Sequence, residues 1–169
     1  VGGRGGQIVR VTNLNNTGPG SFRAACEMSG PRIVVFDVGG TIEGNAAANG
    51  FIELDRPHIT IAGQTAPGGI CLRGVGLHIE DTHDVVIRHM RFRRGKDDNG
   101  LPPSGHHDCV FIGDADPSPH NVIIDHCSMT WSISRCMAIW NEAYDITVQN
   151  CIIGESLEEQ KGFLIGDNV

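Results

Sequence analysis

The sequence has few aromatic residues and an excess of acidic over basic residues. Aromatics make up 5% of the chain, and 13 Lys and Arg residues face 20 Asp and Glu residues, which gives a formal charge of −7. Nucleic-acid-binding domains usually show the opposite balance, so we expect no nucleic-acid partner. No run of 18 apolar residues is present, so we expect no membrane span. Residues 1–6 do not resemble a signal peptide, and we expect the chain as given to be already processed or truncated.

Glycine and small apolar residues dominate what is present. The 169 residues include 23 glycines, and 40% are apolar, which is typical of one globular domain with many tight turns. Six cysteines lack the paired spacing of a zinc site, and most lie in apolar runs such as that around Cys109. We interpret them as small core residues, although disulfides remain possible.

An internal repeat is visible in the second half of the chain. Three eight-residue segments, 85–92, 122–129 and 146–153, share one pattern. Each has apolar residues at positions one, three, six and eight and a polar pair at positions four and five. This pattern predicts a strand, a bend and a second strand in each segment. The residue before each segment is Asp84, Asn121 or Asp145, all of which favour turns.

The repeat predicts a solenoid built of short strands. Its segments begin 37 and then 24 residues apart, and units of this size bury their apolar faces only against their neighbours. The longer interval contains a polar, Gly- and Pro-rich stretch around residues 93–107, which we interpret as a loop insertion. Periodicity alone also permits a β-sandwich or a jelly roll.

Several segments resemble polysaccharide lyase family 1, the pectate lyase and pectin lyase-like proteins. These are Gly2 to Leu14, Val34 to Ile42, Ile59 to Gly68 and Asn121 to Ser128, in family order. The resemblance implies an all-β, right-handed parallel β-helix forming one domain over residues 1–169, truncated at both ends. It also implies a secreted or periplasmic enzyme that cleaves pectate by β-elimination, generally with calcium, and that is a monomer at full length.

The resemblance places one metal-ligating residue at Asp108. In the family, acidic residues cluster here, but His106 and His107 stand where further acids are common. Calcium prefers carboxylate oxygens, so one Asp beside two His is a poor calcium site. These three residues could equally be solvated loop residues.

Arg135 stands where similar proteins carry an acid of a second cluster, and the preceding acid position holds Ser134. Three interpretations compete. Arg135 could replace calcium as the cation that contacts the substrate, it could mark a protein with lost or changed activity, or it could pair with Asp108 or Glu142. The first interpretation requires Arg135 and Asp108 to lie on one face in neighbouring layers.

Lys161 matches a lysine that contacts substrate in the family, although a lone lysine in a turn is often only solvated. The resemblance places the catalytic arginine about one rung beyond Lys161, past Val169, so the catalytic residue is unknown here.

We interpret Asp125 and His126 as structural, because the same step of the other segments also holds polar residues.

Two further functions stay open beside a lyase acting on an acidic polysaccharide. The protein could bind a polysaccharide without cleaving it, having lost the calcium site, or it could be an adhesive or structural repeat. We also expect residues 1–169 alone to expose an open solenoid end, and therefore to aggregate or dimerise end to end.

Overall fold

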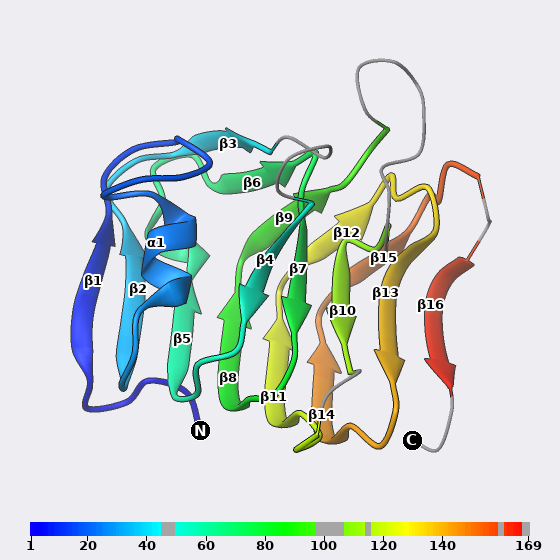
Figure 1. The fold of residues 1–169 in the computed structure, drawn as a ribbon. Helices are drawn as coiled ribbons and strands as arrows, with labels where there is room; N and C mark the ends of the chain where they lie inside the picture. The colour runs from blue at the N-terminus through cyan, green and yellow to red at the C-terminus, as the bar shows by residue number, and fades with distance from the viewer. Residues whose placement is uncertain (45–49, 97–106, 114–115, 159–160, 167–169) are drawn as a thin grey trace.

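The computed structural model shows a parallel β-helix, which confirms the predicted fold (Figure 1). The structure describes residues 1–44, 50–96, 107–113, 116–158 and 161–166. Within them, the first two strands of the chain lie in the same sheet, and each later strand passes to the next sheet. Strands of successive rungs pair in parallel to form three sheets. Among the described residues, no helix is long and apolar enough to cross a lipid bilayer.

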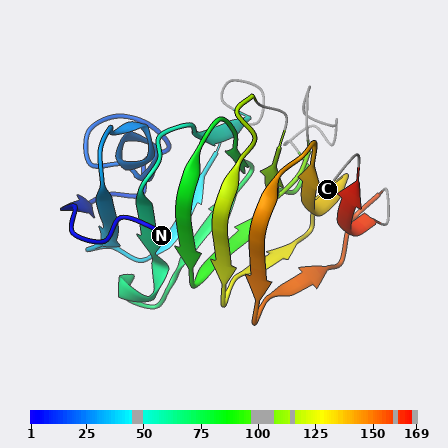
Figure 2. The same ribbon diagram turned by 90° about the horizontal axis from the view of Figure 1, so that it is seen from below.

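The first sheet, sheet A, contains the first strand of each repeat. Its strands follow one another in chain order and lie side by side (Figure 2). Its members are β1 (Gln7–Val11), β2 (Arg32–Phe36), β5 (Ile59–Ala62), β8 (His83–Arg88), β11 (His120–Asp125) and β14 (Tyr144–Gln149).

Sheets B and C complete each rung. Sheet B contains β3 (Gly40–Glu43), β6 (Ile70–Arg73), β9 (Met90–Arg93), β12 (Ser128–Thr130) and β15 (Ile152–Gly154). Sheet C contains β4 (Phe51–Leu54), β7 (Gly76–Ile79), β10 (Val110–Ile112), β13 (Arg135–Trp140) and β16 (Lys161–Gly166).

The register of the repeat is the predicted one. Val85, Val122 and Ile146 are partners in sheet A. The pairing of Ser128 with Arg91 and Ile152 brings the preceding residues, Met90, Cys127 and Cys151, into one row of sheet B. Met90 and Cys127 are buried, and Cys151 packs against the same core.

Left-handed backbone conformations form the corners between sheets A and B. His89, His126 and Asn150 have φ of 55°, 53° and 54°, and each stands at the predicted polar step. Asn tolerates this conformation well, and a histidine can adopt it at modest cost. The predicted turn residues Asp84 and Asn121 also have positive φ, but β8 and β11 begin one residue before them.

The core runs along the inside of the solenoid and is closed at its N-terminal end by a helix. Ile59, Val85 and Val122 are fully buried, as are most inward residues of the three sheets. Helix α1 (Phe22–Glu27) packs on β1 and β4, and Ser21 caps it by accepting from the Ala24 N–H at 3.2 Å. A short 3-10 helix, η1 (Gly63–Thr65), turns the chain between β5 and β6.

The last strands of the described chain leave apolar side chains exposed. Phe163 and Ile165 of β16 continue the inward rows of Met137 and Ile139, yet they are 42% and 58% exposed. The core rows are therefore open to solvent at this end.

The cysteines carry free thiols, and burial raises the pKa of Cys109 and Cys127 to about 12.

Candidate functional site

The three predicted site residues lie together where the strands of sheet C begin. Arg135 and Lys161 are the first residues of β13 and β16, and they are direct partners across the two strands. Val110 pairs with Met137, so Asp108, two residues before β10, lies beside Arg135 on the preceding rung. The expected placement of Asp108 and Arg135 in neighbouring layers is confirmed.

Asp108 and Arg135 form a buried, bidentate ion pair. Arg135 Nε donates to Asp108 Oδ1 at 2.7 Å, and Nη2 donates to Oδ2 at 2.8 Å. The backbone N–H of Arg135 adds a third bond to Oδ1 at 3.2 Å. The side chain of Asp108 is 0% exposed and that of Arg135 is 16% exposed. Such a fork geometry holds a guanidinium in one orientation.

A row of rings on sheet C supports the guanidinium from one side. Arg135 Cζ lies 5.8 Å from the centroid of the Phe111 ring. The Phe111 and His78 centroids are 5.2 Å apart, and His78 stacks on Phe51 at 3.7 Å. Phe111 and His78 are 1% and 4% exposed, so they form a base under Arg135 and not a surface for sugar rings.

The described residues around Asp108 do not fit a calcium ion. Calcium takes six to eight oxygen ligands, whereas both carboxylate oxygens of Asp108 already accept hydrogen bonds from Arg135. The backbone oxygen of His107 accepts from the Ser132 hydroxyl. His106 and most of the predicted insertion lie outside the described residues, although Arg93 within it ends β9 and Arg94 is buried. Calcium dependence stays a prediction.

Hydroxyl groups occupy the neighbourhood of the second expected acidic cluster. Ser134 is 8% exposed, and its N–H donates to the Ser132 hydroxyl at 3.3 Å. Ser156 on the next rung donates its hydroxyl to Ser134 O at 2.8 Å. Successive turns are thus joined by neutral hydrogen bonds.

Lys161 provides an exposed cation next to the buried pair. It is exposed, whereas Arg135 is only partly accessible. The formal charges of Asp108, Arg135 and Lys161 sum to +1. Substrate contact by Arg135 and Lys161 stays a prediction, but their adjacency on successive strands is established.

Sequence reasoning did not identify a second group of polar residues in the turns between sheets B and C. Trp131 is 50% exposed, and its indole N–H donates to Glu155 Oε2 at 3.1 Å. The Arg93 guanidinium lies 5.4 Å from the Trp131 ring centroid. Lys96 forms an ion pair with Glu158, which precedes Lys161 by three residues. In the sequence, only the isolated Trp131 within a polar stretch could have indicated this group.

Asp125 and His126 belong to a stack at the corner between sheets A and B. His126 Nδ1 lies 2.7 Å from Asp125 Oδ1, Asn150 Nδ2 donates to the same oxygen at 3.1 Å, and Arg88 Nε lies 3.3 Å from Oδ2. The His126 ring stacks on that of His89 at 4.8 Å. The Asn150 hydrogen bond, followed by that from His126, lowers the pKa of Asp125. These contacts link three rungs.

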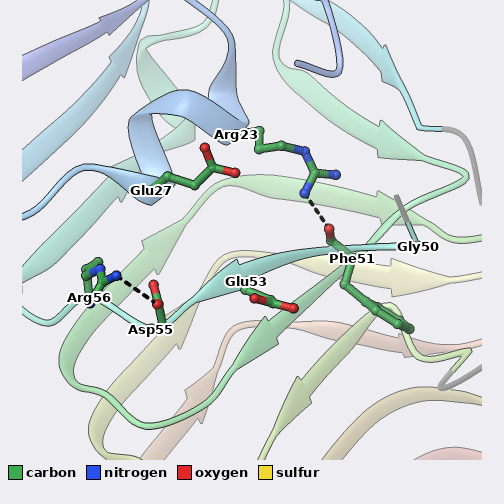
Figure 3. Close-up of a pocket in the computed structure, with 7 residues that line it drawn as sticks. All are labelled: Arg23, Glu27, Gly50, Phe51, Glu53, Asp55 and Arg56. Atoms are coloured by element: carbon green, nitrogen blue, oxygen red, sulfur yellow. Dashed lines mark hydrogen bonds and ion pairs between the residues drawn. The ribbon is translucent and has the colours of Figure 1, made fainter. Parts of the chain in front are cut away.

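A separate hollow lies between α1 and β4 (Figure 3). It has a volume of about 370 Å³ and contains three carboxylates and two guanidinium groups, from Arg23, Glu27, Glu53, Asp55 and Arg56. Arg23 Nη1 donates to Phe51 O at 2.6 Å, and Arg56 Nη2 lies 3.4 Å from Asp55 Oδ2. Its mixed charges give no preference for an acidic polymer, and no predicted site residue lines it.

The chain is a parallel β-helix that is similar in sequence to pectate lyases, which confirms the resemblance seen in the sequence. It is 39% identical over 159 residues to probable pectate lyase C of Aspergillus flavus, covering 94% of this chain and 34% of that protein. The corresponding protein of Aspergillus terreus is 40% identical over 159 residues, with the same shares covered. Pectate lyase plyB of Emericella nidulans is 30% identical over 173 residues, covering 98% and 44%.

A solved structure supports the fold assignment. The crystal structure of jun a 1, the major allergen from cedar pollen, superimposes with a TM-score of 0.68 at 19% identity, covering 87% of this chain and 44% of that one. This likeness shows the fold alone. No family profile matches the chain. The chain spans about a third of the length of the pectate lyase C proteins it matches, at 34%.

Proposed function

We propose that this chain is part of a secreted lyase that cleaves pectate, or a similar acidic polysaccharide, by β-elimination. The adjacency of Arg135 and Lys161 carries the proposal, because it places two basic side chains on successive rungs of the solenoid. The sequence of this chain is similar to those of fungal pectate lyases. Successive rungs are about 4.8 Å apart. A row of basic residues along the solenoid axis suits a polymer that carries a carboxylate on each sugar.

The chemistry requires a cation near the substrate carboxylate. β-Elimination removes the proton on the carbon beside the carboxyl group, and the resulting enolate-like charge is stabilised by a positive group in contact with that carboxylate. Arg135, oriented by Asp108 and Phe111, and Lys161 are positioned to supply this charge without a metal ion. The base that takes the proton lies outside the residues assigned here.

The ion pair between Asp108 and Arg135 favours a second candidate function, that of a β-helix protein that binds the polymer without cleaving it. Asp108 partly neutralises Arg135, so the net local charge is +1 and the electrostatic stabilisation of an enolate is weaker than with a divalent ion. Such a protein would retain binding through Lys161 and lose catalysis.

The test is to mix the full-length protein with polygalacturonate and follow the ultraviolet absorbance of unsaturated uronate products. Growth of this absorbance supports the lyase. Binding of the polymer in a sedimentation assay, with no unsaturated product, selects the binding protein and rejects the lyase. Lys161→Gln is expected to weaken either property, whereas His89→Asn, at the corner between sheets A and B, is the matched control and is expected to behave like the parent.

A further inference from the structure

A cluster of two histidines and one aspartate lies at the start of sheet A. Among the described residues, His58, His83 and Asp84 form the one group of His, Cys, Asp or Glu side chains whose potential ligand atoms all lie within 4.8 Å of one another. The group sits where sheet A strands begin, whereas Arg135 and Lys161 sit where sheet C strands begin. It therefore takes no part in the proposed substrate site.

The strand register brings the three residues together. Ile59 pairs with Val85, which places the preceding residues, His58 and Asp84, side by side on neighbouring rungs. Both have a left-handed backbone, with φ of 59° and 56°, and the His58 N–H donates to His83 O at 3.2 Å. The ligand atoms are thus carried by hydrogen-bonded backbone on two rungs and not by a free loop.

The separations match those of ligands around a small divalent ion. His58 Nδ1 lies 3.4 Å from Asp84 Oδ2, and His83 Nδ1 lies 2.9 Å from the same oxygen. Ligands about 2.0–2.1 Å from a tetrahedral zinc ion are about 3.3 Å apart. The two observed distances bracket this value, and the third pair of ligand atoms, on His58 and His83, lies within 4.8 Å.

We propose that His58, His83 and Asp84 bind a zinc ion that joins the rungs of β5 and β8. Two imidazoles and one carboxylate are a zinc ligand set, with a water molecule completing the tetrahedron. Calcium is a hard ion that prefers oxygen ligands and does not suit two imidazoles. The His83 ring is also held from the other side, because it stacks on His120 at 5.0 Å with 16° between the planes.

In the 169-residue chain, the charged amino group of Val1 lies next to the cluster, and its effect on metal binding has to be measured. It lies 3.5 Å from Asp84 Oδ1, the oxygen that does not face the histidines. An ammonium at this position lowers the affinity of the carboxylate for a metal ion through like-charge repulsion. Acetylation of the amino terminus removes the charge, and we expect it to tighten zinc binding.

The experiment is isothermal titration of the metal-free 169-residue chain with zinc and, separately, with calcium. We expect one zinc per chain, a zinc-dependent rise in Tm, and no calcium binding. His58→Asn, His83→Phe and Asp84→Asn are each expected to weaken zinc binding about tenfold or more. Asn tolerates the left-handed backbone at 58 and 84, and Phe preserves the stack on His120. Circular dichroism checks that each variant is folded.

The matched control is His89→Asn, the same substitution in the same backbone conformation, since φ of residue 89 is 55°. It is expected to bind zinc like the parent. The proposal is overturned if the parent does not bind zinc, or if the cluster variants bind as well as the control. X-ray absorption of the zinc complex gives a second readout, in which imidazole nitrogen ligands are expected and sulfur ligands, drawn from the six cysteines, would contradict the assignment.

Discussion

Arg135 and Asp108 are joined by two parallel side-chain hydrogen bonds of 2.7 and 2.8 Å across neighbouring rungs of the solenoid. The family resemblance implied an acid of a calcium site where Arg135 stands, whereas the chain contains an internal ion pair there. Both carboxylate oxygens of Asp108 accept hydrogen bonds from Arg135. The pair also fixes the arginine next to Lys161, the neighbouring residue on β16.

The first prediction concerns the stability of this pair. Asp108 is 0% exposed, so replacing Arg135 by Gln leaves a buried carboxylate without its partner. We expect Arg135→Gln to reduce the free energy of unfolding by about 3 kcal/mol, a typical value for breaking a buried pair. The double variant Asp108→Asn/Arg135→Gln is expected to lose less than the sum of the single variants. Urea unfolding of the four proteins measures this coupling, and additive losses would show that the pair contributes nothing.

The second prediction is a pH dependence caused by Asp125. Hydrogen bonds from Asn150 and His126 lower its pKa in the folded state. A carboxyl group with a lowered folded pKa contributes stability that is present above its unfolded pKa of about 3.9 and is lost as pH falls through the folded value. Tm should therefore fall on acidification below about pH 4, and less steeply in Asp125→Asn. Identical pH profiles for the parent and this variant would contradict the assignment.

Much of the fold was predictable because a strand repeats its side-chain direction every two residues. The common phase of the three repeat segments determined which residues face the core, as Val85, Val122 and Ile146 show. Contacts between rungs were harder to predict, because rung lengths vary and the partner of a given residue depends on where each turn ends. Asp108 and Arg135 could be assigned to neighbouring layers, since each stands two residues before an aligned strand position, Val110 or Met137.

Other contacts gave weaker signals in the sequence. His58 and Asp84 meet only because Ile59 pairs with Val85, and the segment around Ile59 is a faint copy of the repeat. Helix α1 was not predicted, although Ser21 before an Ala-containing stretch is a recognisable start signal. Whether Arg135 pairs with Asp108 or with Glu142 could be decided only from the structure, since the length of the arginine side chain allows either ion pair.

The third prediction concerns the association of the 169-residue chain. Phe163 and Ile165 are exposed at the open end, and β14, β15 and β16 are the last strands of their sheets among the described residues. Exposed apolar edge strands pair with other chains. We expect sedimentation velocity to show concentration-dependent dimers or larger species. Phe163→Lys with Ile165→Lys should shift the chain toward monomer, and a parent that stays monomeric at all concentrations would refute end-to-end association.

The most direct test of the account is the effect of a calcium chelator on the cleavage of polygalacturonate by the full-length protein. If Arg135 and Lys161 supply the positive charge at the substrate carboxylate, unsaturated products should form at the same rate with chelator and with added calcium. Arg135→Gln and Lys161→Gln should each lower kcat/KM, by about tenfold or more for loss of a charged contact in the transition state. Complete loss of product formation in the chelator, with the Arg135 variant as active as the parent, would contradict the account.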